Sequence, residues 1–306
     1  MKVFCSPIGT FSTAMVRIAN ALKRYAPAYV QFVDNEADAD VSVMYVIGFD
    51  YMDRASRLLA QGKKYIALQC CLKSTSNTVE SEWCWLWRNA ELTWSYYDLR
   101  EHAASAGFNF YYSPLGVDDV FKQELGVKTP RNFVITSGYV HGSGQEALAE
   151  VWDAARAVGL RTIHIGPPDI QGTDQRADEH CQPGDNELAV LYRRARWCVS
   201  LRHLEGFELP AAEALSMGAG AIVFDQSSLH HWYRDLALFV PECSGEMLVG
   251  HLHRIFTRAD YRRLVDDEWA IDEARDRFNW QTICTEFWRR LEVVKQADVK
   301  ETAYAD

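Results

Sequence analysis

Two glutamates eight residues apart, Glu205 and Glu213, stand in a segment that reads as strand, loop and helix. Glu205 lies in the expected loop, and Glu213 lies in the first turn of the helix predicted over residues 210–217. Pro210 is placed where a missing N–H costs nothing, and Gly206 allows the backbone to approach a ligand closely. The free N–H groups and positive dipole end of such a helix favour an anion. One carboxylate can therefore reach a sugar ring while the other holds a diol.

The local sequence around this pair favours a ligand site over a purely structural role. Acidic side chains are common near helix N-termini because they interact favourably with the helix dipole, so neither glutamate alone indicates a site. Here, small, aromatic and turn-forming residues accompany both carboxylates, namely Gly206, Phe207, Leu209 and Pro210. The combination predicts a functional turn.

Strand patterns rich in Val, Ile, Tyr and Phe alternate with amphipathic helical patterns along the chain. Such alternation is typical of a parallel sheet with helices on both faces. A break containing Gly126 and Pro130 separates two series. We therefore expect an α/β protein with two doubly wound Rossmann-like domains that face a central cleft, where ligands bind at the carboxyl ends of the strands. Strands are predicted at residues 3–5, 29–33, 41–47, 65–69, 92–96 and 108–112, then at 132–136, 161–165, 197–201 and 221–224.

The functional turn resembles that of the retaining glycosyltransferases of family 4, which have the GT-B fold. The hallmark of that family is a Glu, seven residues and a second Glu, in a context like EGF-x-LP-x-x-EA followed by small residues. Residues 205–218 read EGFELPAAEALSMG. Further similar stretches are NELAVLYRRAR at 186–196, PLGVDDVF at 114–121 and ARDRFNW at 274–280. The resemblance spans most of residues 90–295, and the first 90 residues match in pattern only.

The resemblance implies an organisation and an activity. Residues 1–123 would form an acceptor-side domain, residues 124–270 a donor-binding domain, and residues 271–306 a helix that returns to the N-terminal domain. The implied reaction transfers a sugar from a nucleotide-diphosphate sugar, a co-substrate, to an acceptor with retention of configuration. No metal and no other cofactor is expected, because preorganised hydrogen-bond donors would stabilise the leaving diphosphate.

The resemblance also implies roles for single residues. Glu205 would face the transferred sugar and the reacting centre, and Glu213 would bind the ribose hydroxyls of the donor. Gly9 and Thr10, in the first strand–helix loop, would approach the diphosphate or the acceptor from the opposite wall. Backbone amides of the turn would hold the diphosphate and the sugar, and the residues concerned are Gly206, Phe207, Glu208 and Leu209.

The chain departs from the family at two places. Family members have Gly-Arg near the start of the second domain and Lys-Gly about five residues later, and this Arg–Lys pair neutralises the diphosphate. Residues 137–145 here read SGYVHGSGQ, so Gly138 is retained, Tyr139 replaces the Arg, and Ser143 or Gly144 replaces the Lys. The His that many members have after the fourth strand is also missing, and the residues there are Gln69, Cys70 and Cys71.

A substitute cation is expected for the missing pair. A diphosphate carries about two negative charges, whereas one helix terminus supplies only about half a positive charge. Arg202 is the first candidate because it lies at the end of the strand that leads to Glu205. His141 and His203 are secondary candidates. The alternative is that Arg202 only pairs with Glu205 or Glu208.

Composition bears on partners and location. The net charge of −10 opposes a surface that neutralises phosphate backbones, so nucleic acid is not an expected partner. Charges interrupt every apolar run well short of the roughly 20 residues of a membrane span, and the N-terminus does not read as a signal peptide. Basic pairs such as Lys23–Arg24 leave peripheral membrane contact open. The eight cysteines lack metal-type spacing, which indicates a reduced, cytoplasmic protein.

Three other functions stay open. A non-catalytic GT-B relative that binds a nucleotide or a protein partner is suggested by the missing Arg–Lys pair. A sugar-nucleotide epimerase would share the fold, but the Glu205–Glu213 pattern disfavours it. A phage-type DNA base glycosyltransferase is opposed by the acidic charge balance.

Overall fold

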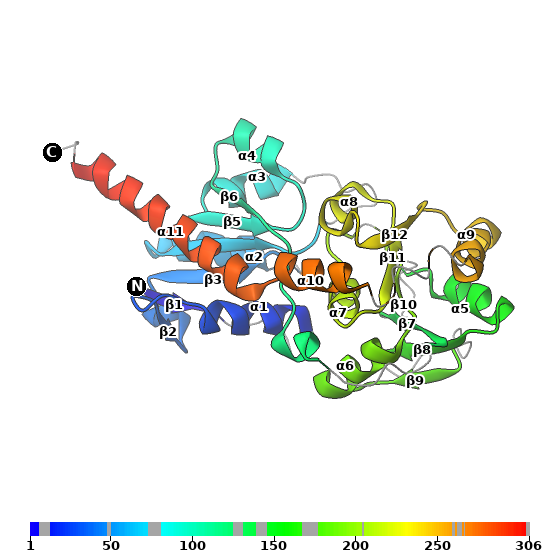
Figure 1. Cartoon of the computed structure of the whole chain (residues 1–306). Helices are drawn as coiled ribbons and strands as arrows, with labels where there is room; N and C mark the ends of the chain where they lie inside the picture. Colours follow the sequence, from blue (N-terminus) through cyan, green and yellow to red (C-terminus); the bar gives the residue numbers. More distant parts are fainter. Residues whose placement is uncertain are drawn as a thin grey trace. The chain divides into compact units, whose positions relative to one another are not determined.

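The structure, a computed structural model, contains two compact units of α/β type (Figure 1). Unit 1 comprises Met1–Gly116 and Asn279–Asp306, and unit 2 comprises Val117–Phe278. Each unit has one six-stranded sheet in which all neighbouring strands are parallel, so the predicted fold class of two doubly wound α/β sheets is confirmed. The structure describes residues 1–5, 13–47, 50–72, 81–124, 131–138, 146–166, 177–203, 205–258, 261, 265 and 267–303.

The sheet of unit 1 has the strand order β2-β1-β3-β4-β5-β6. Strands β3 and β5 are buried along their whole length, and β4 is buried except for its first residue, Lys64, as is typical of central parallel strands. The strands are β1 (Lys2–Phe4), β2 (Gln31–Val33), β3 (Val41–Tyr45), β4 (Lys64–Gln69), β5 (Leu92–Ser95) and β6 (Phe110–Tyr112). The helices are α1 (Thr13–Arg24), α2 (Tyr51–Ala60), α3 (Ser81–Arg88), α4 (Arg100–Ala106) and α11 (Trp280–Ala303), with a 3-10 turn η1 (Glu36–Asp38).

Helix α11 joins unit 1 although it lies at the far end of the chain. The ring of Phe287 lies 5.5 Å from that of Trp94 on β5, and the Trp288 indole N–H donates to the Leu22 carbonyl at the end of α1. The side chains of Phe287 and Trp288 are both buried. The C-terminal helix is therefore part of the core of unit 1.

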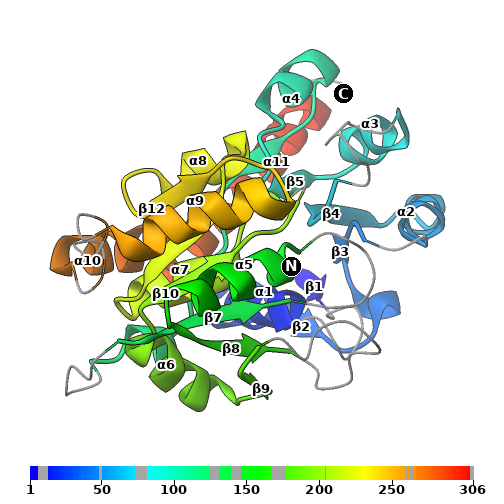
Figure 2. The ribbon, with the colours of Figure 1, turned by 90° about the vertical axis from the view of Figure 1, so that its right-hand side faces the viewer.

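The sheet of unit 2 has the order β12-β11-β10-β7-β8-β9, which is the strand order of a Rossmann fold. Helices α5 and α9 lie side by side over one face, and α7 covers the other (Figures 1 and 2). The strands are β7 (Phe133–Ser137), β8 (Arg161–Ile165), β9 (Glu179–Cys181), β10 (Trp197–Ser200), β11 (Gly220–Phe224) and β12 (Ala237–Val240). The helices are α5 (Leu148–Ala157), α6 (Asp185–Arg194), α7 (Leu209–Ser216), α8 (Ser227–Tyr233), α9 (Gly245–Thr257) and α10 (Glu268–Arg277), with a 3-10 turn η2 (Asp119–Lys122).

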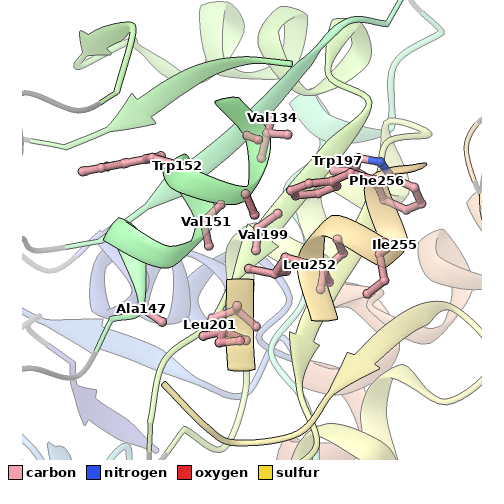
Figure 3. Packing of buried hydrophobic residues seen from close by; sticks show 14 of the residues in the cluster. Val134, Ala147, Val151, Trp152, Trp197, Val199, Leu201, Leu252, Ile255 and Phe256 are labelled. Carbon is pink, nitrogen blue, oxygen red and sulfur yellow. The ribbon is translucent and has the colours of Figure 1, made fainter. Parts of the chain in front are cut away.

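A hydrophobic cluster fixes α5 and α9 on the sheet of unit 2 (Figure 3). Trp197 of β10 is fully buried in this cluster, which also contains side chains of both helices. Burying a large aromatic side chain removes about 150–250 Å² from water, so this cluster holds both helices on the sheet. The carboxyl ends of the strands of this sheet carry the candidate site. The labelled members are Val134, Ala147, Val151, Trp152, Val199, Leu201, Leu252, Ile255 and Phe256.

The helix with Glu213 begins earlier than predicted. Glu208 has an extended backbone conformation and precedes the first helical residue, Leu209, so Pro210 is the second residue of α7. Glu213 is consequently the fifth residue of the helix, and the first turn contains no acidic side chain. The prediction that Glu213 lies in the first turn is wrong, because one more residue takes helical geometry before the proline.

Candidate functional site

The switch point of the unit 2 sheet lies between β7 and β10, which are neighbours in the sheet but not in the chain. From β7 the chain continues to β8 on one side, and from β10 to β11 on the other. Ligands of open α/β sheets bind beyond the carboxyl ends of the strands at such a point. Gly138 directly follows β7, and Arg202 follows β10 by two residues. The sequence-predicted residues of unit 2 therefore converge where the topology favours a ligand.

Arg202 is shared between two carboxylates. Its Nε and Nη2 atoms donate to Glu146 Oε1 at 3.0 and 2.6 Å, and Nη1 donates to Glu205 Oε2 at 3.3 Å. Glu146 and Arg202 also form a backbone bridge, and the Ala147 amide donates to the Leu201 carbonyl. The predicted pairing of Arg202 with Glu205 is present. Glu146 was not anticipated, because 56 residues separate it from Arg202 and only the adjacency of β7 and β10 brings them together.

Glu205 is fixed by backbone and side-chain hydrogen bonds. Its Oε1 atom accepts from the Gly206 amide at 2.9 Å and from the Phe207 amide at 3.4 Å. Burial raises the pKa of its carboxyl, while Arg202 and these amides oppose the shift. The predicted amides of Gly206 and Phe207 therefore bind the Glu205 carboxylate, so a diphosphate would have to compete with it for them.

Gln226 is a site residue that the sequence analysis missed. It follows β11, and its Oε1 atom accepts from the Glu205 amide at 3.1 Å. Its Nε2 atom donates to the Arg202 carbonyl at 3.2 Å. One side-chain amide thus holds both ends of the loop 202–205. A polar residue two positions after a buried strand was the available signal.

Glu208 places a third carboxyl beside Arg202 and Glu205. Its side chain is 7% exposed, and its Oε1 atom has no hydrogen-bond partner among the described residues. The Tyr233 hydroxyl donates to its backbone carbonyl at 2.6 Å. Burial raises the pKa of the Glu208 carboxyl well above its usual range, and Glu205 raises it further, while Arg202 opposes the shift.

This raised pKa makes folding stability depend on pH. The folded state keeps the Glu208 proton at pH values where the unfolded chain has lost it, so stability falls as pH rises from the unfolded pKa through the folded one. Glu208→Gln removes this titration. We expect its free energy of unfolding relative to wild type to increase between pH 5 and pH 8.5 in urea titrations, with Tm rising by about 2–4 °C per kcal/mol. A pH-independent difference would contradict the protonation of Glu208.

Glu213 and Phe207 are both buried. Glu213 lies on α7 and is 3% exposed. Burial is the main cause that raises the pKa of the Cys198 thiol to about 12, and Glu208 and Glu213 raise it as well. The Phe207 ring stacks on Tyr233 at 5.5 Å and packs edge-on against Phe278. The Phe207 side chain therefore belongs to the core, so only its backbone is available to a ligand. Leu209, also among the predicted residues, is the first residue of α7.

The remaining predicted residues are placed as follows. Gly138 has a φ of 147°, and a Cβ there would lie 3.0 Å from Glu146 Cγ, so a glycine is required beside Glu146. His203 Nδ1 lies 2.7 Å from Glu242 Oε1, and its ring stacks on Phe224. Gly9, Thr10 and His141 lie outside the described residues.

The described residues contain neither a metal-binding cluster nor a membrane-spanning helix. In them, no group of three or more His, Cys, Asp or Glu side chains is arranged to hold a metal ion. No helix within those ranges is long and apolar enough to cross a membrane.

Comparison with known proteins bears on the fold. No protein-family model matches the chain, and no curated protein matches its sequence. HepE from Anabaena in complex with UDP-glucose has a TM-score of 0.70 at 12% identity, over 95% of this chain and 99% of its own. Sucrose-phosphate synthase from Thermosynechococcus elongatus has a TM-score of 0.65 at 15% identity, over 96% and 82%. The fold is GT-B.

The GT-B fold alone does not specify a reaction. A Listeria monocytogenes protein described as a UDP-N-acetylglucosamine 2-epimerase also matches, with a TM-score of 0.52 at 11% identity, over 92% of this chain and 80% of its own. At such identities the likeness shows the fold, and a function has to be argued from the residues of the site.

Proposed function

We propose that this protein is a retaining, metal-independent glycosyltransferase that uses a nucleotide-diphosphate sugar as donor. The observation that carries the proposal is the cluster at the β7/β10 switch point, where Arg202, Glu205 and Gln226 are joined directly before the N-terminus of α7. Such a turn favours an anion through its amides and helix dipole. The acceptor is a separate molecule, and the acidic balance of the chain disfavours nucleic acid in that role.

The proposed roles follow the sequence resemblance. Glu205 faces the transferred sugar, and Glu213 binds the donor ribose. The diphosphate lies against the turn before α7 and against Arg202, with Gly138 and His141 contributed by the neighbouring loop. The resemblance also assigns Gly9 and Thr10 to the diphosphate or the acceptor. The amides of Glu208 and Leu209 contribute as well, and those of Gly206 and Phe207 do so by exchanging the Glu205 carboxylate for the diphosphate.

A thermal-shift screen against nucleoside diphosphates and their sugars tests this proposal. A ligand at 100 times its Kd stabilises the folded state by about 2.7 kcal/mol. We expect the matching nucleotide to raise Tm in EDTA as much as in Mg²⁺. Absence of a shift with every nucleotide, or a shift that requires Mg²⁺, would contradict the proposed site.

Glu213→Ala separates donor binding from fold integrity. A charged hydrogen bond contributes about 1.5–3 kcal/mol, so loss of the ribose contact should weaken nucleotide affinity by roughly 10- to 150-fold. Isothermal titration with the nucleoside diphosphate measures the change, and circular dichroism verifies folding of the variant. Unchanged affinity in a folded variant would show that Glu213 does not bind the ribose.

A non-catalytic nucleotide-binding relative is the second candidate. It is favoured by the engagement of Arg202 with Glu146 and by the loss of the usual clamp, in which Tyr139 replaces the Arg and Ser143 or Gly144 replaces the Lys. In that case a nucleoside diphosphate binds, but no nucleotide sugar is consumed. Measuring binding and turnover on one preparation distinguishes the two functions.

A further inference from the structure

We propose that Glu146 is a positioning residue that sets the affinity of the site for diphosphate, because it competes with the diphosphate for Arg202. This inference rests on the proposed function and adds a residue to which neither the sequence pattern nor the resemblance assigns a role. Its basis is the ion pair between the loops that follow β7 and β10.

The contact geometry shows a strong engagement of the guanidinium. Both Nε and Nη2 of Arg202 donate to the same oxygen, Glu146 Oε1, at 3.0 and 2.6 Å. The Nη1 contact to Glu205 is longer, at 3.3 Å. A guanidinium has five N–H donors, so these contacts use three and leave two for a further oxygen. Arg202 can therefore reach a diphosphate only as a cation already shared by two carboxylates.

Glu146 is held in place from several sides. Its side chain is 8% exposed, whereas that of Arg202 is 32% exposed. The backbone bridge to Arg202 and the bond from the Ala147 amide to the Leu201 carbonyl fix its position. Gly138 lies against its side chain, and a Cβ at that position would crowd Glu146 Cγ at 3.0 Å. Glu146 is thus a fixed negative charge, and Arg202 is the more exposed partner of the pair.

The charge balance gives the direction of the effect. Glu146, Arg202 and an ionised Glu205 sum to one negative charge, which opposes the approach of a diphosphate. Glu146→Gln makes this sum zero and preserves an oxygen that accepts from the guanidinium. The interaction of a buried charge with a nearby anion is little screened by salt. The variant should therefore bind diphosphates more tightly with its geometry retained.

The test is isothermal titration of UDP, GDP and ADP, and of their nucleosides, into wild type and Glu146→Gln. We expect about a tenfold lower Kd for the nucleoside diphosphate that wild type binds, with the nucleoside Kd unchanged within twofold. Glu146→Asp keeps the negative charge and should bind diphosphates more like wild type than Glu146→Gln does. Glu179→Gln is the matched control, because it removes the carboxylate from another Arg–Glu pair, with Arg161, on the surface of the same unit.

A second measurement keeps the inference testable if the Glu146 variant is less stable. In an Arg202→Gln background, Glu146→Gln should give a smaller gain in diphosphate affinity than in wild type, since the part of the effect that acts through the Arg202 contact is lost and only the removed negative charge remains. Unchanged or weaker diphosphate binding by Glu146→Gln, or an equal gain for the nucleoside, overturns the role of Glu146 while the proposed function stands. If no protein in the series binds any nucleoside diphosphate, both are overturned.

Discussion

Glu205→Gln should lower kcat by about 10²–10³-fold with little change in KM, by the magnitude typical of losing one electrostatic contact to a transition state. Glycosyl transfer develops positive charge at the anomeric centre, so a carboxylate there interacts more strongly with the transition state than with the bound donor. Glutamine keeps an oxygen that can accept from the Gly206 and Phe207 amides, and it removes the charge together with the second oxygen, which accepts from Arg202. Steady-state kinetics with saturating donor measures the effect.

The control for this prediction is Asp153→Asn. Asp153 pairs with Arg156 on the surface of α5, so its neutralisation removes the same kind of charge from the same unit without touching the proposed site. Its kcat should remain within twofold of wild type. A folded Glu205→Gln variant with wild-type kcat would remove Glu205 from the reacting centre.

Gly220→Ala should destabilise unit 2 more than other single-methyl additions. Gly220 on β11 is the register partner of Trp197 on β10, and a Cβ at Gly220 would lie 2.2 Å from an atom of that fully buried indole ring. Overpacking of a core costs about 1–3 kcal/mol, and the rigid surroundings of Trp197 place this site at the upper end. A loss near 3 kcal/mol corresponds to a fall in Tm of about 6–12 °C, measurable by calorimetry.

Gly250→Ala provides the matched comparison. Gly250 lies within α9, and a Cβ there has no atom within 4 Å. Alanine should therefore stabilise the helix by about 0.5–1 kcal/mol. If Gly220→Ala were as well tolerated as Gly250→Ala, the packing of Trp197 against Gly220 would not be the reason for a glycine at that position.

The parts of the fold that were predictable are those with local signals. Buried runs such as those of β4 and β11 have the β-branched and aromatic composition of central parallel strands. β9 has only three residues, including Glu179 and His180, so its composition did not indicate a strand. It forms because its backbone completes the edge of the sheet beside β8. Pairing of this kind depends on tertiary context.

The candidate site likewise contains residues that the local sequence predicts and residues that only the fold brings together. Glu205, Gly206 and Pro210 belong to one local motif, and the sequence alone places them in one turn. Glu146 and Gln226 reach this turn from the ends of other strands. Glu146 is 56 residues from its hydrogen-bond partner Arg202, and Gln226 is 21 residues from its partner Glu205. No local pattern records those contacts, because they arise only when β7, β10 and β11 lie next to each other.

Breakage of the glycosyl–phosphate bond of a nucleotide sugar tests the proposed function most directly. Wild-type protein is incubated with UDP-, GDP- and ADP-sugars in EDTA and followed by ³¹P and ¹H NMR. The expected result is release of a nucleoside diphosphate from one donor class, with a product that keeps the anomeric configuration of the donor. Intact donors throughout, from a folded protein that binds the nucleotide, would contradict catalysis and leave nucleotide binding as the function.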